Sequence, residues 1–347
     1  MTAVLTRDGV DVVLDELFAD RIRRAAPLGE HYARLWRRLE LASSGGKRLR
    51  PRLLLDTHRA FGAPSPEDAT TAAAAFELLH TALLLHDDVI DRDLSRRGRP
   101  TVSAEFAADA SRSGLSSHTA SAWGDASAIL GGDLLLSAAH ALVAQVRPAV
   151  RAQLADIIDE SLFRAAAGEH DDIAFGLGTA QATPERVVRM MENKTAGYSF
   201  AAPLRAGAAL AGTGEQASTE LEQVGVALGV LYQLRDDLLG VFGDTNRTGK
   251  STTGDLRQGK RTLLVAFAEG RPAWSAVRHL WGDSQLDESG AERLRTALVT
   301  TGARDATVDL IDRMRRATIT TIGETTLPSG LRQQLVALTN TLAERES

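Results

Sequence analysis

Apolar residues recur at three- and four-residue spacing along most of the chain, which is the period of an amphipathic α-helix. Alanine and leucine, which favour helices, fill most of these positions, whereas alternating runs rich in valine, isoleucine and threonine are nearly absent. This pattern predicts helices over residues 10–25, 30–43, 50–62, 66–92, 124–145, 149–169, 184–211, 217–242 and 257–269, and two or three further helices after residue 282. We therefore expect an all-α protein.

Two stretches lack the helical pattern. Residues 94–125 are rich in serine and glycine and predict a long connection, and residues 243–261 combine glycine, threonine and lysine with few apolar side chains. Long loops within a compact domain are commonly functional. Because no proline-rich linker, internal repeat or change of composition divides the chain, we expect residues 1–347 to form one domain, a single large helical bundle.

The composition narrows the class of protein. The net charge of −5 argues against a general nucleic-acid-binding surface, so we expect no nucleic-acid partner. The chain contains no cysteine, which excludes disulfides, cysteine-ligated zinc and cysteine nucleophiles. Its first 20 residues carry acidic residues among the apolar ones and lack the plan of a signal peptide, which predicts a cytoplasmic protein.

The most apolar stretch, residues 69–90, is long enough to be considered as a membrane span. Glu77 and His80 interrupt it, however, and two aspartates end it. A buried core helix fits this pattern better, so we expect no membrane span in this chain.

Three carboxylates follow that apolar stretch. Asp87, Asp88 and Asp91 stand at positions i, i+1 and i+4, so a helix places Asp87 and Asp91 on one face with Asp88 beside them. Like charges at this spacing repel one another. A hard divalent cation such as Mg²⁺ offsets that repulsion, since it takes carboxylate oxygens together with substrate phosphates. The stripe predicts a Mg²⁺ site; the alternative is a solvated acidic helix end.

The pair Glu77 and His80 indicates a second kind of metal site. Di-iron carboxylate bundles use a Glu-x-x-His motif from each of two helices. This chain has no second Glu-x-x-His, which argues against a di-iron protein.

Basic clusters alternate with the acidic ones. GGKRLRPR (45–52) precedes the carboxylate stripe and SRRGR (95–99) follows it, and further lysines stand at Lys194, Lys250 and Lys260. A diphosphate held by Mg²⁺ on one side and by Arg and Lys on the other would explain the alternation, although each basic residue taken alone suits a solvated helix end. The GKS at 249–251 is not a P-loop, because Asp244 stands where that motif needs glycine.

Together these motifs resemble the trans-isoprenyl diphosphate synthases, the polyprenyl synthetase family. Seven matches occur in the family's order: GGKRLRP (45–51), ELLHTALLLHDDVID (77–91), RRGRPT (96–101), GGD (131–133), ENKTAGY (192–198), YQLRDD (232–237) and GKSTTGDLRQGKRT (249–262). The resemblance implies a helical bundle around a deep central cavity, usually as a homodimer. It also implies a reaction that joins isopentenyl diphosphate to an allylic diphosphate, with three Mg²⁺ ions held by two aspartate motifs.

The resemblance also implies roles for individual residues. Asp87, Asp88 and Asp91 match the first aspartate motif, and Asp236 and Asp237 match the second. The positions that bind isopentenyl diphosphate are matched by Lys47, Arg50, His80 and Arg97. Those that bind the allylic diphosphate are matched by Arg96, Lys194, Thr195, Gln233, Lys250 and Lys260. The expected catalytic residues are Asp87, Lys194, Gln233 and Asp236.

The second aspartate motif departs from the family's pattern. Its third aspartate is replaced by Gly240. Asp244 lies on the same helix face as Asp236 but about 12 Å further along it, too far to take the missing position directly. Gly240 could instead end the regular helix, because glycine adopts conformations that other residues avoid. We interpret the site as modified and active.

The helix that carries Asp87 also predicts the product length. In the family, aromatic residues four and five positions before the first aspartate stop chain growth early; here these are Leu83 and Ala82. Deeper positions are Leu79 and Phe76, the latter about 16 Å from Asp87 along a helix. If Phe76 closes the end of the cavity that holds the growing prenyl chain, as its floor, the product is C20 and the protein is most like a geranylgeranyl diphosphate synthase. Alternatively, Phe76 only packs between helices.

Two other functions fit parts of the sequence. A class I terpene cyclase shares the fold and the first motif, but it would carry an Asn/Ser/Glu-type second motif and would not need Lys47, Arg50 and His80. A non-catalytic partner subunit is suggested by Gly240, but such a subunit would more readily lose the first aspartate motif or the basic residues. The sequence favours the synthase.

Overall fold

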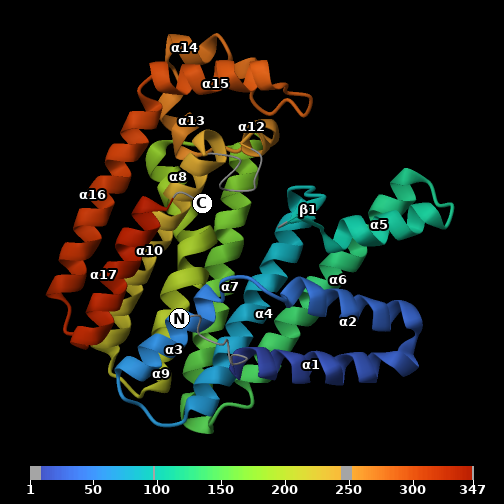
Figure 1. The fold of residues 1–347 in the computed structure, drawn as a ribbon, viewed down its shortest axis with the longest axis vertical. Coiled ribbons are helices and arrows are strands. Elements are labelled where there is room, and N and C mark those ends of the chain that lie inside the picture. Colours follow the sequence, from blue (N-terminus) through green and yellow to red (C-terminus); the bar gives the residue numbers. More distant parts are fainter. Residues whose placement is uncertain (1–8, 97, 244–251, 346–347) are drawn as a thin grey trace, which may run out of the picture. The chain divides into compact units, whose positions relative to one another are not determined.

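The computed structural model of the protein describes residues 9–96, 98–243 and 252–345, and its regular structure is almost entirely helical (Figure 1). The described residues form two compact units. The first unit contains the residues up to Asp156 together with Ala206–Gly212, and the second contains Ile157–Arg205 and the residues from Thr213 onward. The predicted all-α class is confirmed, and the single domain stays a prediction.

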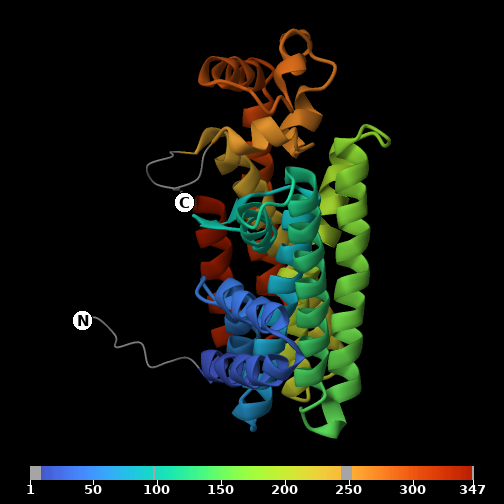
Figure 2. The same ribbon diagram turned by 90° about the vertical axis from the view of Figure 1, so that its right-hand side faces the viewer.

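The first unit is built around two long helices. Its elements are α1 (Gly9–Ala25), η1 (Ala26–Leu28), α2 (Glu30–Ser43), α3 (Leu49–Ala60), α4 (Pro66–Ile90), β1 (Ser95–Arg96), β2 (Arg99–Pro100), α5 (Val102–Arg112), α6 (Ser117–Val143) and the start of α7 (Pro148–Gly176). Helices α4 and α6 run side by side in both views (Figures 1 and 2). Helices α1 and α2 form a helical hairpin, and α3 packs against α4.

Helix α4 is the core helix of this unit. Pro66 begins it and acidic residues follow in its first turn, where they interact favourably with the helix dipole. Every residue from Ala72 to Ala82 is buried, as expected for a helix packed on several sides. The helix ends at Ile90, so the prediction over residues 66–92 holds to within two residues.

The predicted long connection over residues 94–125 is wrong. This stretch contains the short antiparallel pair β1–β2, the whole of α5 and the start of α6. The reason is an apolar stripe on α5, where Val102, Phe106 and Ala110 recur every four residues and are buried. Helix α5 packs on α6, and the Phe106 ring meets the ring of Trp123 edge-on at 6.3 Å.

The serines and threonines of this stretch cap helices. The Thr101 hydroxyl accepts a hydrogen bond from the backbone N–H of Ala104 at the start of α5. The Ser116 hydroxyl does the same for Thr119 at the start of α6. Serine and threonine are favoured at such positions because they satisfy first-turn N–H groups. The serine and threonine residues that suggested a loop therefore include the N-caps of two helices, α5 and α6.

The second unit is centred on α10 (Glu215–Phe242). Its other elements are the remainder of α7, α8 (Pro184–Met191), η2 (Glu192–Ala201), α9 (Ala202–Leu210, up to Arg205), α12 (Gly254–Gln258), α13 (Leu263–Ala268), α14 (Pro272–Ser275), η3 (Arg278–Leu280), α15 (Glu288–Thr300), α16 (Ala303–Glu324) and α17 (Ser329–Glu344). Helix α10 packs against η2, α16 and α17. The three long helices α15, α16 and α17 confirm the prediction for the region after residue 282.

Two predicted helices of this unit differ in the structure. Residues 184–211 are helical almost to their end, but the middle of the segment, η2, is a π-helix. Single π-helical stretches are rare and are often found at functional sites. The helix predicted over residues 257–269 is wrong as one element: Gly259 takes a left-handed conformation (φ 70°) and ends α12, and the chain resumes as α13 at Leu263.

One helix in the described residues, α6, is long and apolar enough to cross a membrane by length and composition. Half of its most apolar window is buried inside the protein, where it packs against α4 and α5. Helix α6 is thus a core helix of the first unit.

Candidate functional site

The first aspartate motif lies at the C-terminal end of α4. Asp87 and Asp88 belong to the last turn, and Asp91 is the residue directly after the helix. The backbone N–H of Asp91 donates to the Asp87 carbonyl oxygen at 2.8 Å, so the helical geometry continues through the motif. Asp88 is buried, whereas Asp87 and Asp91 are half-buried. A rigid core helix therefore presents the predicted carboxylates.

Arg96 lies directly on these carboxylates. Its Nη2 is 3.0 Å from Asp87 Oδ2, and its Nε is 2.5 Å from Asp88 Oδ1. The β1–β2 pair carries Arg96, and the Thr101 hydroxyl holds the same segment by donating to the Asp93 carbonyl oxygen at 2.9 Å. The resemblance implies that Arg96 binds the allylic diphosphate; in the structure its guanidinium contacts the aspartates of the first motif.

The buried carboxyl of Asp88 has an unusual protonation equilibrium. Burial raises the pKa of Asp88 to about 6, and the positive charge of Arg96 opposes this rise. A cation in contact with Asp88 therefore favours its ionised form. This environment suits a carboxylate that receives a positively charged partner.

The basic loop before α3 is held by Arg48, a member of the GGKRLRPR cluster for which the resemblance implies no separate role. Arg48 adopts a left-handed conformation (φ 47°), which is uncommon for a residue other than glycine. Its guanidinium pairs with Asp11 at 2.7 Å and with Glu77 at 2.9 Å. Arg48 therefore anchors the turn that contains exposed Lys47 and that leads into the first turn of α3, where Arg50 is half-buried.

Glu77 connects this loop to α4. It is almost fully buried and lies three residues before His80, so the two residues are on neighbouring turns of one helix face. His80 is buried as well. The Arg48–Glu77 ion pair thus ties the basic loop to the part of α4 that carries His80. The sequence pattern could not predict the Arg48–Glu77 pair, because the two residues are 29 positions apart and meet only through tertiary packing.

The predicted chain-length residues follow α4 inward from the aspartates. Leu83 is half-buried, and Ala82, Leu79 and Phe76 are buried. Phe76 has 1% of its surface exposed and is among the largest fully buried side chains. Of these four residues, leucine and alanine stand nearer the carboxylates, and the one phenylalanine, Phe76, lies deepest along α4.

In the second unit, Lys194 lies on the π-helix η2 and points to α7. Its Nζ pairs with Glu169 at 2.9 Å and with Asp172 at 2.7 Å. The two elements approach so closely that a Cβ atom added at Gly168 would lie 2.2 Å from the Lys194 backbone nitrogen. Gly168 is therefore required for the observed position of Lys194.

A chain of hydrogen bonds joins η2 to the second aspartate motif on α10. The Thr195 hydroxyl donates to Gln233 Oε1 at 3.3 Å, and Gln233 Nε2 donates to Asp237 Oδ1 at 2.7 Å. Asp236, the neighbouring residue, pairs with Arg345 at 3.5 Å. The structure thus brings Thr195, Gln233 and Asp237 together, as the sequence prediction implies.

Gly240 is closely approached by a carboxylate from another element. A Cβ atom added at Gly240 would lie 1.9 Å from Asp255 Oδ2, an oxygen on α12. Burial raises the pKa of Asp237 to about 8, and the negative charges of Asp255 and Asp236 add to the rise, whereas Gln233 and Lys260 oppose it. Asp255 and Lys260 therefore both act on the second aspartate motif. Asp255 was not among the residues predicted from the sequence.

Arg97, Asp244 and Lys250, which entered the sequence analysis, lie outside the described residues. Within residues 9–96, 98–243 and 252–345, no three acidic or histidine side chains already converge to hold a metal ion. The donors present are carboxylate oxygens, which suit Mg²⁺, an ion that completes its shell with water and substrate phosphates. The donor chemistry of both motifs thus fits Mg²⁺.

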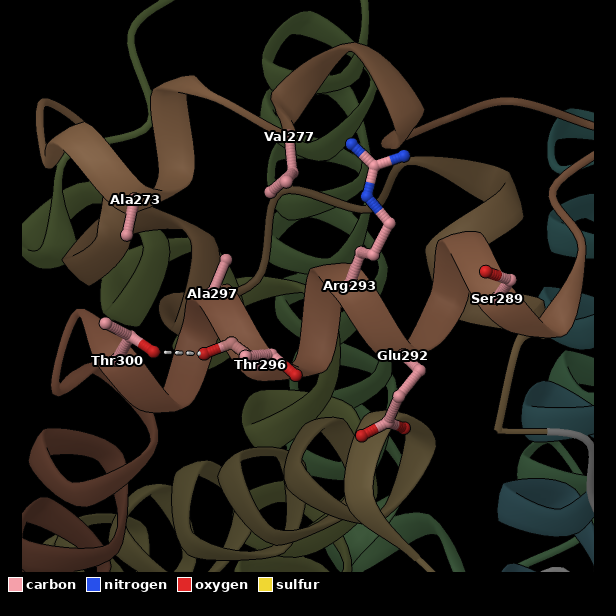
Figure 3. A pocket seen from close by; sticks show the side chains of 8 residues that line it. All are labelled: Ala273, Val277, Ser289, Glu292, Arg293, Thr296, Ala297 and Thr300. Atoms are coloured by element: carbon pink, nitrogen blue, oxygen red, sulfur yellow. Dashed lines mark hydrogen bonds between the residues drawn. The ribbon is translucent and has the colours of Figure 1, made fainter.

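A separate surface pocket lies on the segment from α14 to α15 (Figure 3). It is lined by Ala273, Val277, Ser289, Glu292, Arg293, Thr296, Ala297 and Thr300. The side chains drawn in Figure 3 include none of the predicted site residues. We therefore assign no part of the chemistry to this pocket.

Comparison with known proteins gives consistent matches. A family model described as Polyprenyl synthetase matches residues 38–293. The chain is 35% identical over 275 residues to the geranylfarnesyl diphosphate synthase of Aeropyrum pernix, which covers 77% of this chain and 80% of that protein. It is 38% identical over 250 residues to the (2E,6E)-farnesyl diphosphate synthase of Mycobacterium bovis, which covers 71% of this chain and 63% of that protein.

A solved structure is similar over nearly the whole chain. The geranylgeranyl pyrophosphate synthase from Corynebacterium glutamicum, complexed with isoprenyl diphosphate and magnesium, superimposes with a TM-score of 0.87 at 29% identity. The match covers 97% of this chain and 98% of that one. These three similar proteins carry three different prenyl groups in their names.

Proposed function

Because the chain belongs to the polyprenyl synthetase family and is a trans-prenyltransferase of that family, we propose that its product is geranylgeranyl diphosphate, made from isopentenyl diphosphate and an allylic diphosphate. The observation that carries the product length is the position of Phe76. It is the first phenylalanine, tyrosine or tryptophan ring inward from Asp87 on α4, and it is fully buried. Eleven residues of α-helix correspond to about 16 Å, the length of growing chain that such a floor admits.

The two aspartate motifs are the expected Mg²⁺ ligands, three ions per active site in all. The residues that would hold them are Asp87, Asp88, Asp91, Asp236 and Asp237. When bound, Mg²⁺ neutralises the negative charge that builds up on the departing diphosphate. Asp87 and Asp88 already stabilise a positive group, the guanidinium of Arg96, which supports this assignment.

The basic side chains divide between the two substrates. Lys47, Arg50, His80 and Arg97 are proposed to bind isopentenyl diphosphate. Arg96, Lys194, Thr195, Gln233, Lys250 and Lys260 are proposed to bind the allylic diphosphate. Gln233 is positioned by two hydrogen bonds, which gives it a defined orientation toward a ligand. Lys194 is held by two carboxylates, and its ammonium group is suited to stabilise a leaving diphosphate.

The apolar side chains have a role of their own. Loss of diphosphate from the allylic substrate leaves a cation that water would capture. Leu83, Leu79 and Phe76 on α4 are proposed to line the space for the prenyl chain and to exclude water from it. The released diphosphate is the proposed proton acceptor, so the chain needs no separate basic side chain for that step.

Product analysis tests the proposal. Purified protein is incubated with labelled isopentenyl diphosphate, Mg²⁺ and each of the C5, C10 and C15 allylic diphosphates, and the products are dephosphorylated and sized by chromatography. We expect a C20 alcohol. Longer products would keep the enzyme class and discard the floor at Phe76, and no condensation with any primer would overturn the proposed reaction.

Substitution of the floor residue sharpens the test. Phe76→Ala is expected to lengthen the product, because it removes the ring that blocks the path along α4. Phe18→Ala on α1 is the matched control, since Phe18 is also buried, with 2% of its surface exposed. Either substitution costs about 3–5 kcal/mol in unfolding free energy, so both are assayed where they remain folded. An unchanged product distribution for Phe76→Ala would reject the floor.

The proposal also covers the cellular location and the oligomeric state of the protein. We propose a cytoplasmic homodimer, on the basis of the family resemblance and the half-buried state of α6. Size-exclusion chromatography with light scattering measures the oligomeric state directly. A mass of one chain, 37.1 kDa, would contradict the dimer.

A further inference from the structure

Position 240 has no side chain, yet the space beside it is filled. Asp255 Oδ2 occupies the place where a side chain on residue 240 would begin, 1.9 Å from the position of such a Cβ atom. The two residues are 15 positions apart in the sequence and lie on different helices, α10 and α12. Glycine at 240 is thus the residue that leaves room for the Asp255 carboxylate.

We propose that Asp255 supplies the third carboxylate of the second aspartate motif, in place of a side chain on residue 240. This inference rests on the proposed function, because it concerns the Mg²⁺ that this motif holds. It names a metal-ligating residue for the reaction on an element outside the motif itself.

The position of Gly240 on α10 supports the assignment. Residues three and four apart share a helix face, so Gly240 lies on the face that carries Asp236 and Asp237. The Asp255 carboxylate therefore approaches α10 on the helix face that carries the two aspartates.

Helix α12 is anchored well enough to hold a ligand in place. Leu256, the next residue, is fully buried, and its carbonyl oxygen accepts a hydrogen bond from the Gly282 N–H at 2.9 Å. The Arg257 guanidinium donates to the Leu286 carbonyl oxygen at 2.8 Å and 3.0 Å. These contacts tie α12 to the segment before α15, so the position of Asp255 does not depend on its own side chain.

The chemistry favours a bound cation at this place. Carboxylates that lie near one another without a cation repel one another, and oxygen donors of this kind are those that Mg²⁺ selects. Lys260 supplies some positive charge near Asp237. The alternative is that Asp255 serves only as a polar residue of α12 near this lysine. The two roles predict different behaviour toward metal.

Metal binding without turnover distinguishes them. The variant Asp255→Ala is titrated with Mn²⁺ in the presence of inorganic diphosphate, and free Mn²⁺ is measured by electron paramagnetic resonance. We expect one class of bound Mn²⁺ to weaken by at least about tenfold. Asp305→Ala is the control, because the Asp305 side chain is 76% exposed on α16. Equal titrations for Asp255→Ala and the wild type would overturn the assignment.

Thermal unfolding adds a readout that a merely structural role would not give. Removing the Asp255 carboxylate, which lies near other acidic groups, is expected to leave the metal-free Tm unchanged or higher. The rise in Tm on adding Mn²⁺ with diphosphate is expected to be smaller than in the wild type. A lower metal-free Tm with an undiminished metal-induced rise would show that Asp255 only supports α12.

A relocation variant gives the decisive comparison. Gly240→Asp combined with Asp255→Ala returns the third carboxylate to α10 and clears the space that it needs. This double variant is expected to recover most of the Mn²⁺ affinity that Asp255→Ala loses. If it binds Mn²⁺ no better than Asp255→Ala, the two positions are not equivalent and the assignment fails.

The binding assay also separates this inference from the proposed function. A wild-type protein that binds Mn²⁺ with diphosphate through Asp255 but joins no primer would refute the proposed reaction and keep the ligand. A protein that makes a prenyl diphosphate with undiminished Mn²⁺ binding in Asp255→Ala would keep the reaction and refute the ligand.

Discussion

Gly168 on α7 offers a strong test of how the fold positions Lys194. A Cβ atom at residue 168 would lie 2.2 Å from the Lys194 backbone nitrogen, 2.6 Å from its Cα and 2.8 Å from its Cβ. None of these atoms belongs to a flexible side-chain end. The substitution Gly168→Ala therefore cannot be absorbed by a change of rotamer, and α7 and η2 must move apart.

The size of that movement follows from the geometry. Ordinary contacts of a Cβ atom begin at 3.4 Å, so the shortest contact must lengthen by about 1.2 Å. Overpacking of this kind costs about 1–3 kcal/mol in unfolding free energy. Displacement of a substrate-positioning group by about 1 Å can reduce the rate by about 100-fold. The variant should lose activity more strongly than stability.

The control for this prediction lies on the same helix. Gly176 ends α7, and a Cβ atom added there would meet no atom within 4 Å. Gly176→Ala should therefore change the unfolding free energy by no more than about 1 kcal/mol and leave kcat/KM for the allylic substrate unchanged. Denaturant unfolding and steady-state kinetics of both variants give the comparison. If Gly168→Ala matched Gly176→Ala in both measurements, the close approach of α7 to Lys194 would be without consequence.

Two further predictions concern the first unit. Glu77→Gln weakens the ion pair that holds Arg48, which should lower the unfolding free energy by about 1–3 kcal/mol and raise KM for isopentenyl diphosphate more than KM for the allylic substrate; an equal change in both KM values would contradict this role. Burial lowers the pKa of His58, so His58 contributes stability above the unfolded pKa of about 6.5 that is lost as the pH falls below it. The Tm of the wild type should therefore fall relative to that of His58→Phe between pH 7.5 and pH 5, and a constant difference would refute the assignment.

The long helices and the first aspartate motif were predictable because they depend on local signals. The apolar run before Asp87 predicts α4 and its carboxyl end, and the spacing of Gln233, Asp236 and Asp237 predicts one face of α10. Such patterns are set within a few turns of one helix. The observed helices agree with these patterns because the patterns depend on residues within the same helix.

The remaining features depend on contacts between elements. Asp255 meets Gly240 only because the chain returns to α10 after residue 251, and no spacing rule relates the two residues. The stretch from residue 94 onward was misinterpreted for a different reason. Its serines and threonines have the composition of a loop, but Thr101 and Ser116 use their hydroxyls to start helices. The hydrogen bonds of these two hydroxyls stabilise the starts of α5 and α6, and the amino-acid composition alone does not reveal them.

The contact of Arg96 with the first aspartate motif has a consequence for how the protein matures. A buried carboxylate such as Asp88 would oppose folding if it had to wait for an ion from solution. Arg96 supplies the positive charge from within the chain, at 2.5 Å from Asp88. In many small domains whose metal site does not form without the ion, folding is coupled to metal binding. Arg96 thus offsets the charge of Asp88 from within the first unit, so we expect this unit to fold without a cation bound at the first aspartate motif.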